Sequence, residues 1–261
     1  MRFSIIAIAL SLAASVTAAP LEKRIIGGTA VGKNEIPFIA EFLSRNSPCT
    51  GFVVHPRAIM TAAHCMNNRG RTGVVYGSNR HAEGTGARIV KWLPHPDYNR
   101  TLQHHDIGLV FLEKKVTVKP ARLLTPPHSY PRTGTKVVAA GYGVIKNAVG
   151  DEPAVQSEVL NKVTLTASSK TTCKNNYPTF LGDYQFCTDY IPLGRSVCHG
   201  DSGGPVMVGE GRDRYVIGLV NHGVGKGIKC GEEGGYQYYT YIKPYIPWMD
   251  EEIERFLEEE E

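Results

Sequence analysis

Several common functional signals are missing from this sequence. The formal net charge is only +4 over 261 residues. Setting aside residues 1–24, which hold Arg2, Glu22, Lys23 and Arg24, leaves 26 basic and 24 acidic residues. A charge this small points neither to nucleic acid nor to a membrane surface as a partner. No repeat of fixed period runs along the chain, which argues against solenoid and propeller folds.

Metal-binding patterns are missing as well. No two of the six cysteines have the Cys-x-x-Cys spacing of typical zinc sites. His104 and His105 precede Asp106, but adjacent residues on a strand point to opposite faces and chelate a metal poorly. We therefore expect no metal and no cofactor, and we expect both histidines to be solvated.

A long apolar stretch is confined to the start of the chain. Arg2 provides a short positive start, residues 5–16 are mostly apolar, and residues 17–19 are small, as a signal peptidase requires. We interpret residues 1–19 as a signal peptide and expect a secreted, extracellular protein. An anchoring helix is the alternative, but the stretch is short for a membrane span and no second one follows.

The rest of the chain has the pattern of a β protein that ends in a helix. Its 28 glycines fit a loop-rich β protein better than a helical one. Met249, Ile253, Phe256 and Leu257 share one face at helical spacing, which predicts a helix over residues 248–257. Short runs of β-branched residues between turn residues predict strands at 51–54, 74–77, 87–93, 107–112, 136–140, 161–166, 184–187, 205–208, 215–220 and 238–241.

One segment suggests chemistry, namely Cys198-His199-Gly200-Asp201-Ser202-Gly203-Gly204-Pro205. Small neighbours allow a substrate backbone to approach Ser202 closely. The N–H groups of Gly200 and Ser202 could hold a developing oxyanion. A serine hydroxyl is a weak nucleophile and needs a base. The chain offers His64, within Thr61-Ala62-Ala63-His64-Cys65, and an acid, Asp106, before an apolar run.

In the order His64, Asp106, Ser202, these segments resemble the trypsin/chymotrypsin family of serine endopeptidases. The resemblance implies an all-β fold of two antiparallel six-stranded β-barrels with the active site between them, plus a C-terminal α-helix. It places the N-terminal barrel at 25–134, the C-terminal barrel at 135–244, and the helix with an acidic tail at 245–261.

The resemblance also implies the catalytic roles. Ser202 would be the nucleophile and His64 the general base, while Asp106 would fix the tautomer of His64. Because His64 must be neutral to accept a proton, activity should fall below about pH 7. The substrates would be proteins or peptides, and protein protease inhibitors are possible partners of a monomeric enzyme.

Six cysteines in a secreted chain indicate disulfides, and many pairings are open to them. The resemblance selects Cys49–Cys65, Cys173–Cys187 and Cys198–Cys230, each worth about 3 kcal/mol in the chain-entropy model. Family members that bind calcium use an earlier loop with acidic ligands. The matching residues 77–86 contain only Glu83 as an acid, so we expect no calcium.

Residues 20–24 form a very short propeptide that ends in the dibasic pair Lys23-Arg24, a site of the kind that a kexin-like processing protease cuts. The next residues, Ile25-Ile26-Gly27-Gly28, resemble the mature start of the family. The new amino group of Ile25 would pair with Asp201 inside the protein. Both charges of such a buried pair are desolvated, so leaving one of them without its partner is costly. Before cleavage Ile25 has no free amine to complete the pair, so the precursor should be inactive.

In the family, the residue six positions before the nucleophile lies at the base of the specificity pocket. Here it is Ser196, followed by Val197. A neutral floor gives a substrate ammonium no partner, so we expect a chymotrypsin-like preference for large apolar or aromatic residues. Such an enzyme should not cut after Arg24 itself. The alternative is that another carboxylate, Glu232 or Glu233, reaches the pocket.

The pocket entrance departs from the family pattern. The usual Ser-Trp-Gly is replaced by Asn221-His222-Gly223, and either Gly235 or Gln237 falls near the pocket wall. Two histidines, His199 and His222, could flank the entrance. A preference for acidic residues is therefore a further alternative.

Two other functional classes compete with an active endopeptidase. The Asn221-His222 pair favours a catalytically weak or inactive protease-like binding protein. A small-molecule esterase of the α/β-hydrolase type would match Gly-x-Ser-x-Gly around Ser202, but it requires the order Ser, Asp, His. Separately, Asn99-Arg100-Thr101 is a candidate N-glycosylation site on a surface loop.

Overall fold

The computed structural model describes residues 25–44, 48–66, 71–124, 130–150, 152–189, 194–224 and 228–260. The expected signal peptide, residues 1–19, and the expected propeptide, residues 20–24, lie outside the described residues. No helix in these ranges is long and apolar enough to cross a lipid bilayer.

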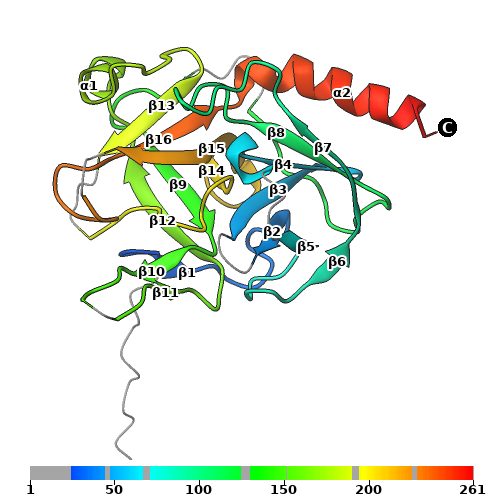
Figure 1. The fold of residues 1–261 in the computed structure, drawn as a ribbon, viewed down its shortest axis with the longest axis horizontal. Coiled ribbons are helices and arrows are strands. Elements are labelled where there is room, and N and C mark those ends of the chain that lie inside the picture. Colours follow the sequence, from blue (N-terminus) through cyan, green and yellow to red (C-terminus); the bar gives the residue numbers. More distant parts are fainter. Residues whose placement is uncertain are drawn as a thin grey trace, which may run out of the picture.

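Figure 1 shows two curled antiparallel sheets side by side, the first built from the earlier half of the chain. Its strands β4 and β8 are buried along their whole length, as continuous apolar runs require. The strands, in the order β6-β5-β2-β3-β4-β8-β7, are β2 (Ile39–Ser44), β3 (Cys49–His55), β4 (Ala58–Thr61), β5 (Arg71–Tyr76), β6 (Thr85–Ala87), β7 (Ile89–Pro94) and β8 (Gly108–Leu112).

The second sheet has the order β1-β12-β9-β14-β15-β16-β13. An isolated bridge between Ala167 and Thr188 links its two ends, so the sheet curls on itself. The strands are β1 (Thr29–Ala30), β9 (Lys136–Gly141), β12 (Asn161–Thr166), β13 (Gln185–Asp189), β14 (Pro205–Val208), β15 (Tyr215–Val224) and β16 (Tyr236–Tyr241).

The expected all-β, two-barrel architecture is confirmed, with one more strand in each sheet than expected. The additional strands are short edge strands such as β1 and β6. Strand β1 pairs with β12, with Thr29 opposite Lys162. The described chain therefore begins in the second sheet before it enters the first.

Shorter elements lie in the connections between the strands and before the C-terminal helix. They are the 3-10 helices η1 (Ala63–Met66), η2 (Gly211–Asp213) and η3 (Lys243–Tyr245), the hairpin strands β10 (Val144–Lys146) and β11 (Val155–Gln156), and the helix α1 (Lys170–Asn176). The sequence did not predict α1. It is capped by Ser169, whose hydroxyl accepts a hydrogen bond from the Thr172 N–H at 2.9 Å.

The C-terminal helix α2 (Ile246–Glu258) packs along the first sheet (Figure 1). Phe256 stacks on Phe111 of β8 with ring centroids 4.3 Å apart. Carboxylates at a helix C-terminus oppose the helix dipole, which predicts fraying. Just beyond the helix end, Glu260 pairs with Arg57 at 2.9 Å, and Glu259 lies 3.4 Å from Lys91. The first sheet thus supplies the cations that the helix end needs.

Candidate active site

Strand pairing brings His64 and Asp106 together. In the antiparallel register of β4 and β8, Thr61 lies opposite Gly108. The chain leaves β4 towards His64 on η1, and Asp106 immediately precedes β8. Residues that lie just beyond paired strand ends must be neighbours, although they are far apart in sequence.

Two hydrogen bonds fix the histidine against the aspartate. The backbone N–H of His64 donates to Asp106 Oδ1 at 2.8 Å, and its ring Nδ1 lies 2.6 Å from Oδ2. The Asp106 side chain is fully buried, whereas that of His64 is 27% exposed. The buried carboxylate therefore orients the ring and leaves Nε2 for another partner.

Thr240, which the sequence did not single out, supports Asp106 from behind, and Asn221, which it did, supports Thr240. The hydroxyl of Thr240 donates to the Asp106 backbone carbonyl at 3.0 Å. The Asn221 amide in turn donates to Thr240 Oγ1 at 3.3 Å and to the Gln103 carbonyl at 3.2 Å. Because side chains alternate between the two faces of a strand, the sequence of β16 could have placed Thr240 on the face opposite Tyr239 and Tyr241. It could not have predicted the contact between Thr240 and Asp106.

The turn that carries Ser202 packs against the strand ends that hold His64. The Ser202 carbonyl accepts a hydrogen bond from the Thr50 N–H at 2.9 Å. A Cβ on Gly203 would lie 2.1 Å from Thr61 Oγ1 and 2.8 Å from the Ala62 nitrogen, so only glycine allows this approach. Ser202 and His64 therefore come from different sheets. The Ser202 carbonyl oxygen lies 3.6 Å from Sγ of Cys65, the residue after His64, and no hydrogen bond joins the Ser202 and His64 side chains among the described residues.

Two amide groups on this turn are open. The N–H groups of Asp201 and Gly203 donate to the carbonyls of Cys198 and Val220 at 3.1 and 2.8 Å. Among the residues that the structure describes, those of Gly200 and Ser202 donate to no backbone carbonyl. Gly200 has φ +96°, a conformation that glycine adopts without strain. The turn thus presents two N–H donors to a ligand.

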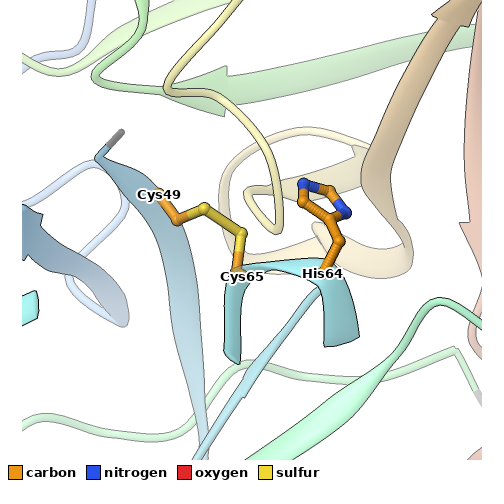
Figure 2. A group of neighbouring side chains, drawn as sticks. All are labelled: Cys49, His64 and Cys65. Carbon is orange, nitrogen blue, oxygen red and sulfur yellow. A yellow bond between two sulfur atoms is a disulfide. The ribbon is translucent and has the colours of Figure 1, made fainter. Parts of the chain in front are cut away.

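The three disulfides are Cys49–Cys65, Cys173–Cys187 and Cys198–Cys230, the pairs that the resemblance implied. Figure 2 shows the first of them beside His64. Potential ligand atoms of Cys49, His64 and Cys65 lie within 4.8 Å of one another. Both sulfur atoms are bonded to each other, so neither is the thiolate that a metal requires.

His104 and His105 are half-buried and bound to protein groups, whereas free solvation was expected. The Nε2 atom of His104 lies 2.5 Å from the carbonyl of Thr179. His105 Nδ1 lies 3.0 Å from the hydroxyl of Tyr245. Each ring therefore has its own protein partner and serves to anchor the loop before Asp106.

Asp201 is a fully buried carboxylate held by backbone alone. The N–H groups of Gly143 and Cys198 each donate to it at 2.8 Å. Burial raises its pKa to about 7, against the lowering effect of those two bonds. No cation among the described residues pairs with Asp201. A Cβ on Gly141 would lie 2.3 Å from Oδ1, so glycine is required beside it.

The described chain begins next to this region. Ile25 is completely buried and shares a hydrophobic cluster with Val197. The Ile26 carbonyl accepts a hydrogen bond from the Ser196 N–H at 3.0 Å. Because Ile25 follows Arg24 in this uncleaved chain, its nitrogen is still a peptide nitrogen.

Several of the residues expected at the specificity pocket are buried and contact one another. Ser196 is fully buried, and its hydroxyl has no partner within the described ranges. The Gln237 amide donates to the Val197 carbonyl at 3.3 Å, and Gln237 lies opposite Gly223 in the β15–β16 register. Gln237 therefore contacts the residue after Ser196 and pairs with the strand that carries Asn221 and His222.

His222 is packed as an uncharged ring. It stacks on the ring of Tyr238 with centroids 5.4 Å apart, and it packs edge to face against the ring of Tyr177 with centroids 5.0 Å apart. Its Nδ1 lies 3.0 Å from Asn221 Oδ1. Burial lowers the pKa of His222 to about 4. The ring is therefore neutral near pH 7 and gives an acidic substrate no cation.

Comparison with known proteins identifies the family. A family model described as Trypsin matches residues 25–249. A glandular kallikrein of Sus scrofa is 28% identical over 260 residues, covering 90% of this chain and 98% of the relative. Serine protease 1 of Homo sapiens is 27% identical over 250 residues, covering 94% and 96%. Trypsin 5G1 of Aedes aegypti is 31% identical over 238 residues, covering 87% and 84%. This chain belongs to the trypsin family of serine endopeptidases.

Proposed function

We propose that this endopeptidase cleaves peptide bonds through an acyl-enzyme formed on Ser202. The Ser202 oxygen attacks the scissile carbonyl carbon while its proton passes to Nε2 of His64. The C–N bond then breaks, and His64 returns the proton to the leaving amine. Water, deprotonated by the same histidine, hydrolyses the ester. The observation that carries this proposal is the paired hydrogen bonding of His64 to the buried Asp106.

The open N–H groups of Gly200 and Ser202 are proposed to bind the oxyanion of the tetrahedral intermediate. The N–H groups of the neighbouring Asp201 and Gly203 are engaged in hydrogen bonds, which leaves these two donors for the charge. Removing one such donor typically costs a factor of about 10²–10³ in turnover. Asp106 stabilises the imidazolium that forms next to it.

Replacing Ser202 with alanine tests the proposal. Turnover of the mature protein should fall by a factor on the order of 10⁴–10⁶, with the fold unchanged. Full residual activity would refute the role of Ser202. Wild-type protein that is folded, processed and inert would instead favour the alternative of a protease-like binding protein. The esterase alternative requires an α/β fold, which the two antiparallel sheets exclude.

Activation is proposed to occur by cleavage after Arg24, which gives Ile25 a free amine. Asp201 supports this step, because it is a buried carboxylate that has no cationic partner among the described residues. An ammonium beside it would supply the missing partner. We propose that a separate kexin-like protease makes the cut. Purified precursor that matures alone, at a rate that rises with its concentration, would contradict this.

The specificity proposal is a pocket for uncharged side chains, with large apolar or aromatic residues preferred as in chymotrypsin. The neutral Ser196 and the neutral His222 support it. Glu232 and Glu233 are exposed, and Glu232 accepts a hydrogen bond from the Lys229 N–H at 2.9 Å. Replacing Ser196 with aspartate should shift preference towards basic residues.

The remaining proposals concern the setting of the enzyme. We propose secretion to the extracellular space, protein inhibitors as partners and a monomeric state. Asn99 is exposed, and its Oδ1 accepts a hydrogen bond from the Leu102 N–H at 3.0 Å. Its amide nitrogen is thus available for glycosylation. A mass shift that is removed by an endoglycosidase and lost in Asn99→Gln would support occupancy.

A further inference from the structure

A groove lies between the C-terminal helix and the first sheet, away from the active site. It has a volume of about 470 Å³, and α2 and β3 line it. Its apolar lining comes from Met249, Ile253 and Leu257 on α2 and from Val54 on β3. Val54 and Leu257 are only half-buried, so apolar surface remains available in the groove.

The groove is remote from the chemistry. Strand β3 begins at Cys49, whose disulfide lies beside His64, and ends at His55 in the groove wall. Six residues of extended chain span about 20 Å. A ligand in the groove could therefore bind while a substrate occupies the active site.

Three carboxylates form an edge of this groove, Asp250, Glu254 and Glu258. They repeat every four residues, so successive carboxylates lie about 6 Å apart along the helix. All three are exposed. None forms an ion pair within the described part of the chain.

The other α2 carboxylates behave differently. Glu251 and Glu252 pair with Arg255 at 2.8 and 2.9 Å, and Glu259 lies 3.4 Å from Lys91. Like charges four residues apart on a helix destabilise it, and carboxylates in its last turns oppose the dipole. The unpaired row therefore does not serve the stability of α2.

The wall of the groove opposite the three carboxylates repels an incoming cation only weakly. Burial, with smaller effects from Lys115 and Arg57, lowers the pKa of His55. The ring is therefore uncharged near pH 7. The charge of Arg57 is offset by Glu260 at 2.9 Å. Lys115, which also acts on His55, is exposed, so solvent screens its repulsion, and an incoming positive charge meets attraction at the helix edge.

We infer that this groove is a docking site for a cationic, amphipathic segment of a partner protein. Lysine or arginine side chains of the partner would pair with Asp250, Glu254 and Glu258. Its apolar side chains would enter between Ile253 and Val54. A second copy of this chain does not fit if it presents α2, because its own carboxylates would face the same row. The inference does not depend on the proposed function.

The test measures binding of a synthetic peptide to the Ser202→Ala protein, which removes turnover from the experiment. The peptide carries lysines on one helical face and leucines on the neighbouring face. A control peptide keeps the lysines and replaces the leucines with serines. The key variant is the triple change Asp250→Asn, Glu254→Gln and Glu258→Gln. A matched control, Glu251→Gln, Glu252→Gln and Glu259→Gln, removes the same charge outside the groove.

The groove variant should bind the leucine peptide about tenfold more weakly or worse at low salt, whereas the matched control should change little. The serine peptide should bind more weakly than the leucine peptide. Thermal unfolding of the groove variant should be unchanged or shifted upwards, because like-charge repulsion is relieved. Equal losses in both variants, or equal binding of both peptides, would show general charge attraction and overturn the inference, as would no binding.

Discussion

At the scale of single residues, the partner of a buried carboxylate decides what the group can do. Asp106 receives two hydrogen bonds from His64 and serves to orient a ring. Asp201 accepts hydrogen bonds only from backbone N–H groups, and no cation among the described residues pairs with it. Glu41 is 1% exposed and lies 2.5 Å from His81, and burial raises its pKa. Charge burial of this kind is costly without a partner.

Replacing Asp106 with asparagine should reduce the turnover number by about 10⁴-fold. The amide matches the carboxylate in shape but cannot accept both hydrogen bonds from His64, so the ring takes the wrong tautomer. Steady-state kinetics on the processed variant measures this. A loss below tenfold in a folded variant would show that Asp106 does not orient the base.

Asp201 should make the precursor less stable as the pH rises. Its pKa is raised from 3.8 to about 7 in the folded state, so the folded form holds its proton more tightly. The contribution of Asp201 to the stability of the folded precursor is complete below about pH 4 and is lost as the pH rises through 7. Over this range the free energy of unfolding should fall by about 4 kcal/mol. Urea unfolding of the precursor between these values should show that slope, and Asp201→Asn should flatten it. Identical slopes in both proteins would contradict the unpaired state of Asp201.

Gln237 should limit the depth of the specificity pocket. Its amide donates to the Val197 carbonyl beside the buried Ser196. Removing the side chain in Gln237→Gly opens space there, so kcat/KM for a phenylalanine substrate should rise relative to an alanine substrate. One extra methylene of apolar contact is worth about 1–3 kcal/mol in such pockets. An unchanged ratio would place Gln237 outside the substrate's reach.

At the scale of elements, the strands with clear turn residues at both ends could be predicted in full. Residues 161–166 and 205–208 match β12 and β14. Strands β2 and β4 were missed because the buried Glu41 interrupts the apolar residues of β2, and because β4 is only four residues long. The candidate nucleophile and base could be proposed from local sequence. The support of Asp106 by Thr240 could not, because it depends on how two sheets meet.

The helix α2 should contribute to stability but not to chemistry. Phe256 is 3% exposed, stacks on Phe111 and lies under the Arg57 guanidinium at 4.9 Å. Phe256→Ala should lower the free energy of unfolding by about 3–5 kcal/mol, with kcat unchanged where the variant is folded. Val90→Ala, at a site 44% exposed, should cost less than about 0.5 kcal/mol. Similar losses in the free energy of unfolding for Phe256→Ala and Val90→Ala would show that the packing of α2 does not stabilise the fold.

At the scale of the whole molecule, the active site depends on contact between the two sheets. Both contribute to one hydrophobic cluster, which includes Met60 and Leu109 of the first sheet and Met207 and Leu219 of the second. The second sheet carries Ser202 on the turn before β14, whereas His64 and Asp106 flank strands of the first. Local sequence could not predict this contact in detail, because it arises from tertiary packing. Loss of the interface should abolish turnover before either sheet unfolds.

Covalent labelling tests the central claim most directly. Protein cleaved after Arg24 is treated with a fluorophosphonate, and the adduct is located by mass spectrometry. We predict one phosphonylated residue, Ser202, with labelling that is lost in His64→Ala and slowed in the uncleaved chain. Labelling of another residue, or of Ser202 at an unchanged rate without His64, would contradict the account.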